Sequence, residues 1–125
     1  MDITPVAPAG RQVIQAYRTG GFRIGGSEFE GSILVFPDRV VAWSVARPEE
    51  ISVDSLGEVL GARDSVDILL VGCGPRGVLL SAPLRDALSK ARIVVESMDT
   101  GAACRTYNVL LADDRRVAAA LIALP

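Results

Sequence analysis

The spacing of apolar and polar positions divides the chain into two halves with different rhythms. In residues 13–45, short apolar or alternating runs are separated by glycine and proline turns, a pattern typical of β-strands. The runs predict strands over residues 13–17, 22–24, 27–30, 32–36 and 39–45. Pro37-Asp38 is a turn pair between the last two runs, so residues 32–45 are expected to form a β-hairpin.

The second half has longer segments that alternate between strand and helix. A short helix capped by Ser52 or Asp54 is expected to end at Gly61. Beyond it, the pattern predicts a strand at 66–71, a helix at 82–91, a strand at 92–96, a helix at 100–112 and a strand at 116–124. The last segment is rich in alanine, but its continuous apolar run suits a strand covered on both faces. This β-α-β-α-β order predicts an α/β fold.

Length and composition favour one domain. A chain of 125 residues can bury about two thirds of the surface that its unfolded form exposes, so no disulfide or metal is needed to stabilise it. Residues 1–12 are rich in Pro, Ala and Gly and are predicted to be a flexible tail. Residues 13–125 are predicted to form a single α/β domain.

Charge and hydropathy exclude several classes of protein. Half of the residues are apolar, 22% are charged and the net charge is −2, so neither disorder nor nucleic acid binding is expected. No apolar run reaches the length of a membrane span, and the first residues lack the pattern of a signal peptide. We therefore expect a cytoplasmic protein. Twelve arginines against one lysine fit the codon usage of a GC-rich bacterium.

The absence of histidine restricts the possible chemistry more than any motif extends it. Ser-His-Asp and Cys-His nucleophilic machinery is excluded, as are histidine-ligated metal sites. Lys90 falls near the exposed end of a predicted helix, a poor place to activate a Schiff-base amine. Cys73 and Cys104 cannot form a tetrahedral metal site alone and are expected to be free thiols. We expect no cofactor, and a role without catalysis is favoured.

A formal G-x-G-x-x-G motif follows the predicted strand 66–71, at Gly72-Cys73-Gly74-Pro75-Arg76-Gly77. The next strand ends on Glu96, about where a ribose-binding acid would lie in a dinucleotide fold. However, Pro75 removes one N–H donor, and the helix begins only near Ser81. Glycines and helix start are therefore separated, so no phosphate cradle forms. The motif predicts a tight turn and a crevice lined by backbone, without a dinucleotide.

The helix predicted at 100–112 has a clear core face. Positions 103, 104, 107, 110 and 111 lie on one stripe, which makes Cys104 a small buried side chain and places Arg105 on the opposite face. Asp99 and Thr100 are expected to cap this helix. Gly101 leaves the first-turn N–H groups uncovered, so a small anion could bind there.

Topology brings these two features to one place. If the strands at 66–71 and 92–96 are parallel neighbours, the loops after them share one rim of the sheet. The candidate ligand-binding residues at this rim are Gly72, Cys73, Gly74, Glu96, Asp99 and Thr100. Each residue type also has a purely structural explanation: glycines for the turn, Asp99 for capping and Glu96 for solvation at a strand end.

Residues 98–111 and 116–121 also carry a resemblance. They resemble the signature of a family of small single-domain proteins of undefined biochemical activity, whose eukaryotic members include a mitochondrial assembly factor for respiratory complex I and an adipogenesis-associated protein. The similarity extends through Gly72-x-Gly74, the Pro37 hairpin with Trp43, and residues 26–31. It implies a three-layer α/β fold with a central mixed β-sheet, helices and an additional β-hairpin layer.

The same resemblance implies little about chemistry. The family more often has threonine between the two glycines, so Cys73 is not expected to be a family-wide nucleophile. No catalytic residues are established for the family, and none is transferred to this sequence.

Two classes of function stay open. The resemblance favours a non-catalytic interaction protein, similar to an assembly factor, whose protein partner belongs to a membrane-associated complex. The alternative is a small-molecule binding protein or enzyme that holds an anionic ligand in the crevice, with Cys73, Glu96 or Asp99 as its polar groups. A polar pocket at the rim would favour the second class, and an apolar surface patch would favour the first.

Overall fold

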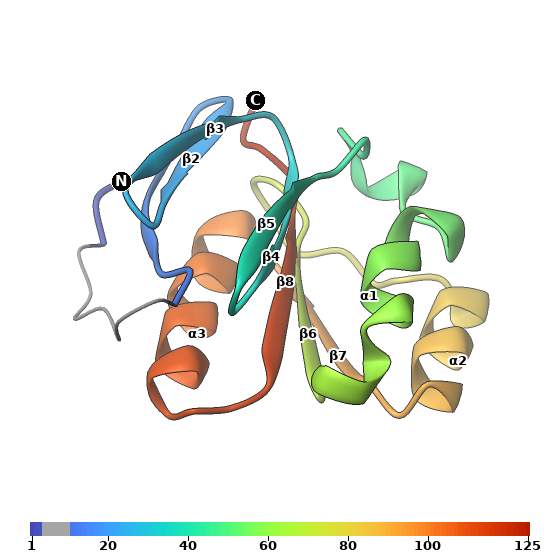
Figure 1. The fold of residues 1–125 in the computed structure, drawn as a ribbon. Helices are drawn as coiled ribbons and strands as arrows, with labels where there is room; N and C mark the ends of the chain where they lie inside the picture. The colour runs from blue at the N-terminus through green and yellow to red at the C-terminus, as the bar shows by residue number, and fades with distance from the viewer. Residues whose placement is uncertain (4–10) are drawn as a thin grey trace.

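The computed structural model describes residues 1–3 and 11–125 of the chain. Most of the predicted tail, at 4–10, lies outside the described residues, whereas Ile3 donates its N–H to the carbonyl of Gln15 and so lies beside the first strand. Figure 1 shows three layers: a central sheet, α1 and α2 on one side of it, and α3 with a smaller sheet on the other. The predicted three-layer α/β fold is confirmed.

The small sheet is an antiparallel meander of three strands. Its strands are β1 (Ile14–Arg18), β2 (Gly21–Ile24) and β3 (Ser27–Glu30). Gly20 lies in the first turn with φ +78°, and Gly25 and Gly26 form the second turn with φ +56° and +84°. These left-handed conformations are ones that glycine adopts without a steric cost. The sheet buries one face, including Ile14 and Phe22, against the rest of the fold.

The central sheet has five strands in the order β5-β4-β8-β6-β7. Its strands are β4 (Ile33–Phe36), β5 (Arg39–Ala42), β6 (Ile68–Gly72), β7 (Val94–Met98) and β8 (Val117–Leu121). β6 runs parallel to both β7 and β8, while β4 is antiparallel to β8 and β5. The predicted hairpin at 32–45 therefore belongs to this sheet, and the additional layer is β1–β3. Every residue of β8 is buried, which confirms the prediction of a strand covered on both faces.

The helices are short. They are α1 (Gly57–Gly61), α2 (Ala82–Lys90) and α3 (Thr100–Ala112), with the 3₁₀ turns η1 (Pro48–Glu50), η2 (Asp54–Leu56) and η3 (Arg63–Ser65). Side chains cap α2 and α3, whereas the predicted cap of the short helix by Ser52 or Asp54 is wrong, because α1 begins after Leu56, which offers no side-chain acceptor. Ser81 caps α2 by accepting the N–H of Leu84 at 3.4 Å. Ser52 accepts the N–H of Ser55 at 3.1 Å ahead of η2 and α1.

Two hydrophobic cores lie on the two faces of the central sheet. Alternate residues of each strand feed opposite cores: Leu69 of β6 faces α1 and α2, and Leu70 faces α3 and the small sheet. The predicted stripe of α3 is confirmed for Cys104 and Tyr107, which are fully buried, while Leu110 is half-buried. Arg105 is exposed, and its Nη1 donates to the hydroxyl of Tyr17 on β1 at 2.8 Å.

Candidate functional site

The end of β6 and the start of α3 meet in a tightly packed junction, as the topology predicts. We call it the glycine-threonine junction; it comprises Gly72–Gly74 and Asp99–Gly101. A Cβ atom on Gly72 would lie 2.9 Å from the Cα of Thr100. Only glycine lets two backbones approach so closely. A Cβ atom on Gly101 would lie 2.7 Å from the hydroxyl oxygen of Tyr17, so this glycine admits β1 against the first turn of α3.

Hydrogen bonds close the junction. The N–H of Cys73 donates to the carbonyl of Met98, and the N–H of Gly74 donates to Oγ1 of Thr100, both at 2.8 Å. Oγ1 of Thr100, which is fully buried, donates in turn to the carbonyl of Ile122 at 2.7 Å. The expectation that the Cys73 and Gly74 N–H groups face a ligand is therefore wrong, because the fold itself supplies their acceptors.

The first turn of α3 is also occupied by the protein. The carboxylate of Asp99 accepts the N–H of Ala102 at 2.8 Å, and the N–H of Thr100 donates to the carbonyl of Gly74 at 2.8 Å. The predicted cap is confirmed for Asp99, whereas Thr100 is the first residue of the helix and its hydroxyl bonds Gly74 and Ile122 instead. Since Tyr17 packs against Gly101, the idea that this glycine leaves the turn uncovered is wrong.

Glu96 lies apart from the other five candidate residues. It is exposed in the middle of β7, in register with Leu70 of β6. The predicted strand boundary at residue 96 is two residues too early, because β6 continues to Gly72 and pairs there with Met98. Asp99 then begins the helix cap at once. That the six residues bind a ligand stays a prediction, and the structure gathers only five of them.

Both thiols are buried. Cys73 is 2% exposed, and burial raises the pKa of its thiol. Cys73 follows strand β6 on a loop, where its thiol could have been accessible, but the loop folds back and covers it: a Cβ atom on Gly77 would lie 3.2 Å from the Cα of Met98. Burial also raises the pKa of Cys104 to about 12. Neither cysteine forms a disulfide.

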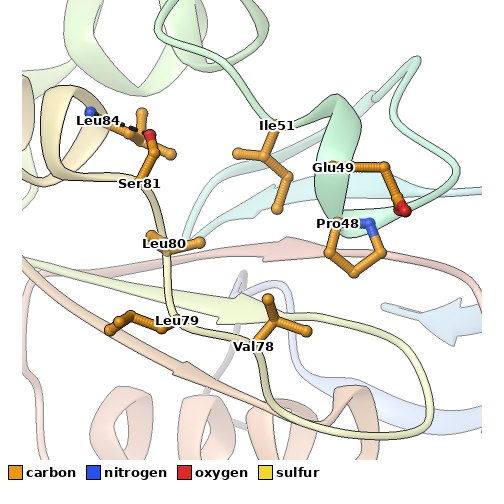
Figure 2. Close-up of a pocket in the computed structure, with 8 residues that line it drawn as sticks. All are labelled: Pro48, Glu49, Ile51, Val78, Leu79, Leu80, Ser81 and Leu84. Atoms are coloured by element: carbon orange, nitrogen blue, oxygen red, sulfur yellow. Dashed lines mark hydrogen bonds between the residues drawn. The ribbon is translucent and has the colours of Figure 1, made fainter.

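An apolar groove opens where the same loop runs on towards α2. It has a volume of about 430 Å³ and lies between the η1 turn and the segment that leads into α2. Figure 2 shows the side chains of Ile51 and Val78 pointing toward each other across it. The lining residues are Pro48, Glu49, Ile51, Val78, Leu79, Leu80, Ser81 and Leu84.

The groove combines a buried floor with an exposed rim. Leu80 and Leu84 are buried, whereas Val78 is 38% exposed and Leu79 is 79% exposed. The backbone of this segment is held at two points. Gly77 packs against Met98, and Nε of Arg85 donates to the carbonyl of Leu80 at 3.1 Å. Exposed apolar side chains on a fixed backbone are a typical protein-binding feature, because the loop loses little conformational entropy when a partner binds.

One lining residue of the groove carries a carboxylate. Glu49 is the only charged lining residue, and it makes no hydrogen bond or ion pair within residues 1–3 and 11–125. Its neighbour Glu50 differs, since its Oε1 accepts the N–H of Ala46 at 2.7 Å. This hydrogen bond is the main reason why the pKa of Glu50 is lowered.

No pattern in the sequence predicts this groove. Its two walls lie about thirty positions apart, and each wall is a short irregular segment without periodicity. One local signal was available: Val78-Leu79-Leu80 is an apolar run directly before the helix cap at Ser81, where an ordinary loop would be polar.

Comparison with known proteins identifies the family. The model of a family described as a protein of unknown function (DUF498/DUF598) matches residues 14–122. The chain belongs to this family. The resemblance drawn from residues 98–111 and 116–121 is thereby confirmed. In this member of the family, the signature residues Asp99, Thr100 and Gly101 build the glycine-threonine junction.

Several relatives from animals share a descriptive name. A Danio rerio protein named NADH dehydrogenase (ubiquinone) 1 alpha subcomplex assembly factor 3 is 37% identical over 113 residues, which is 90% of this chain. The chain spans 65% of the length of that relative.

Solved structures of similar proteins share the fold. The crystal structure of a Bartonella henselae protein, described as an outer membrane protein, is 40% identical with a TM-score of 0.87, covering 93% of this chain and 98% of that one. A solution structure from Bordetella pertussis, described as a Mth938-like domain, is 29% identical with a TM-score of 0.82, covering 98% and 92% of the two chains.

Two further features are absent from residues 1–3 and 11–125. None of the helices there has the length and apolarity to cross a bilayer. In the same residues, no three Cys, Asp or Glu side chains gather into a group that could hold a metal ion.

Proposed function

We propose that this chain is a non-catalytic interaction protein that assists the assembly of a membrane-associated complex. The observation that carries the proposal is the apolar groove, in which Leu79 is 79% exposed on a fixed loop. A single exposed leucine is ordinary on a protein surface. Here the exposed leucine borders a groove with a buried apolar floor, and such a groove is suited to hold a partner's side chains.

The name of a relative supports a particular kind of membrane-associated complex as the partner. A relative that is 37% identical is named an assembly factor of an NADH dehydrogenase. We infer that the partner of this chain is a protein subunit of a respiratory NADH dehydrogenase, which it meets in the cytoplasm. The lack of histidine and the burial of both thiols fit a role that depends on contact area rather than on a reacting group.

The test is genetic complementation in the native cells. Deletion of the gene should reduce the amount of fully assembled NADH dehydrogenase on native gels, and the parent chain should restore it. The variant Cys73→Ala with Glu96→Gln should restore it equally well, because neither group acts chemically in this proposal. Normal assembly in the deletion strain would contradict the proposal.

The second function class has its own outcome in this experiment. A folded Cys73→Ala, Glu96→Gln chain that fails to complement would favour chemistry or ligand binding at the rim. Folding of the variant is checked first by its circular dichroism spectrum and its urea midpoint.

A further inference from the structure

The apolar groove is open and lacks the convergent polar groups that orient a small molecule. Small-molecule sites combine an enclosed apolar cavity with a few placed hydrogen-bonding groups. Here, Val78 and Leu79 stand at the rim, and Glu49 is the only charged side chain among the lining residues. This arrangement suits a segment of a protein chain that lies along the groove and inserts apolar side chains toward Leu80 and Leu84.

The charge around the groove is uneven. The lining residues of the wall at the η1 turn, Pro48, Glu49 and Ile51, include one carboxylate and no basic side chain. Arg47, just before them, has its Nε 3.8 Å from Oε2 of Glu50, so its charge is balanced there. On the opposite wall, Arg85 lies just outside the lining, with its Nε donating to the carbonyl of Leu80. A cation on the bound segment would therefore be attracted to the wall that carries Glu49.

Glu49 is available for this contact. Unlike Glu50, whose carboxylate accepts the N–H of Ala46, Glu49 is not used to stabilise its own turn. A carboxylate beside an apolar groove gains a charge-assisted hydrogen bond when a lysine or arginine arrives with the apolar side chains. Such a pair at a rim contributes more to orientation than to affinity.

We propose that the apolar groove binds a segment of a partner protein that carries two or more large apolar side chains and a lysine or arginine, with the cation paired to Glu49. The inference rests on the proposed function and names the chemistry of the partner at that site. The apolar side chains supply most of the affinity, and the ion pair fixes which way the segment lies.

The experiment uses the full chain and a defined probe. Peptides that bind the parent chain are selected from a random library displayed on phage. Peptides that also bind the Leu79→Ser variant are discarded, because they bind outside the groove. Selected peptides should contain at least two large apolar residues and a Lys or Arg. Fluorescein-labelled peptides then report the dissociation constant by anisotropy.

Matched variants separate the two contributions. Leu79→Ser should weaken peptide binding about tenfold or more, as loss of a central apolar contact does. Glu49→Gln should weaken it about two- to fivefold, and added salt should abolish that difference. Val109→Ser and Asp113→Asn, which change an exposed valine and an exposed carboxylate elsewhere, should have no effect.

Charge reversal gives the sharpest test. A Glu49→Arg chain should bind the parent peptide less tightly and prefer a peptide in which the basic residue is changed to Glu. The inference is overturned if no peptide is enriched, if the enriched peptides lack a basic residue, or if Glu49→Gln and Glu49→Arg bind like the parent.

These outcomes differ from a failure of the proposed function. Normal NADH dehydrogenase assembly in the deletion strain would refute the assembly role whatever the peptides do. A strain that needs the parent chain but is fully complemented by Leu79→Ser would leave the assembly role intact and refute the groove as its docking site.

Discussion

The glycine-threonine junction and the apolar groove are formed by the two ends of one loop, and they differ in almost every physical respect. At the start of the loop, Cys73 and Gly74 give their N–H groups to acceptors within the fold. At its end, Val78 and Leu79 present apolar surface that nothing in the described chain covers. The junction contains the residues that look like a motif, whereas the groove contains none.

A glycine motif therefore marks a place where the backbone is constrained, and the constraint need not come from a ligand. At Gly72 the neighbour that requires glycine is the backbone of Thr100. Binding surfaces instead depend on side chains left uncovered after folding, and these follow from how separate segments pack.

The largest contrast is expected inside the groove, between two adjacent leucines. Leu80→Ala should lower the free energy of unfolding by roughly 2–5 kcal/mol, because it removes a buried side chain from the core. Leu79→Ala should change it by no more than about 0.5 kcal/mol, because Leu79 is mostly exposed. Urea unfolding measures both values. Equal losses would mean that Leu79 also belongs to the core.

The junction should respond strongly to a single methyl group. Gly72→Ala should cost roughly 2–3 kcal/mol, since its Cβ would collide with the backbone of Thr100 at 2.9 Å. Gly57→Ala is the control: a Cβ atom there meets nothing within 4 Å, and alanine should stabilise the start of α1 by up to about 1 kcal/mol. If Gly72→Ala is as stable as the parent, the packing described for the junction is wrong.

The hydroxyl of Thr100 should matter less than the glycine beside it. Thr100→Val keeps the shape of the side chain but leaves the N–H of Gly74 and the carbonyl of Ile122 without their partner. A loss of roughly 1–2 kcal/mol is expected for buried groups left unpaired. Thr106→Val, at a half-buried position of the same helix, should be close to neutral, and thermal or urea unfolding compares the two.

The smallest effect concerns alkaline pH. Burial raises the pKa of Cys104 from 9.0 to about 12, so above pH 9 the unfolded chain loses this proton while the folded chain keeps it. The unfolded state is then favoured as the pH rises, and stability should fall by at most about 1.4 kcal/mol per pH unit from this group.

The slope of unfolding free energy between pH 9 and pH 10 tests this prediction. It should be shallower in Cys104→Ala than in the parent chain. Cys73 adds a slope of the same sign, since burial raises its pKa as well, so the comparison is made in a Cys73→Ala background. Burial also raises the pKa of Tyr107 above its ordinary value of 10.0, but both chains carry this residue, so it does not change the difference between their slopes. An unchanged slope would mean that Cys104 is reached by solvent.

The order of elements could be predicted because it depends on local signals. The side chain and position of Asp99 predict its cap, the start of α2 is expected near Ser81, and the continuous apolar run predicts β8. The start of β7 was placed two residues early. Its position depends on pairing with β6, and register between strands has no signal within one strand.

The candidate site was predicted only in part, because contacts between separate segments leave no signal within either segment. Proximity of Gly72 and Asp99 follows from parallel strands, which topology rules anticipate. The burial of Cys73 depends on how the loop folds back onto Met98, and the hydroxyl of Thr100 replaces the ligand that the motif suggested. The groove requires two irregular segments to meet, so no pattern within either segment could predict it.

The position of β8 has a consequence for synthesis of the protein. This strand comes last in chain order, yet it lies at the centre of the five-stranded sheet, between β4 and β6. Until residues 117–121 have left the ribosome, β4 and β6 have no partner on their inner edges, and both hydrophobic cores lack one wall. The sheet therefore closes only after nearly the whole domain has been translated, and the nascent chain must be kept from pairing with other strands until then.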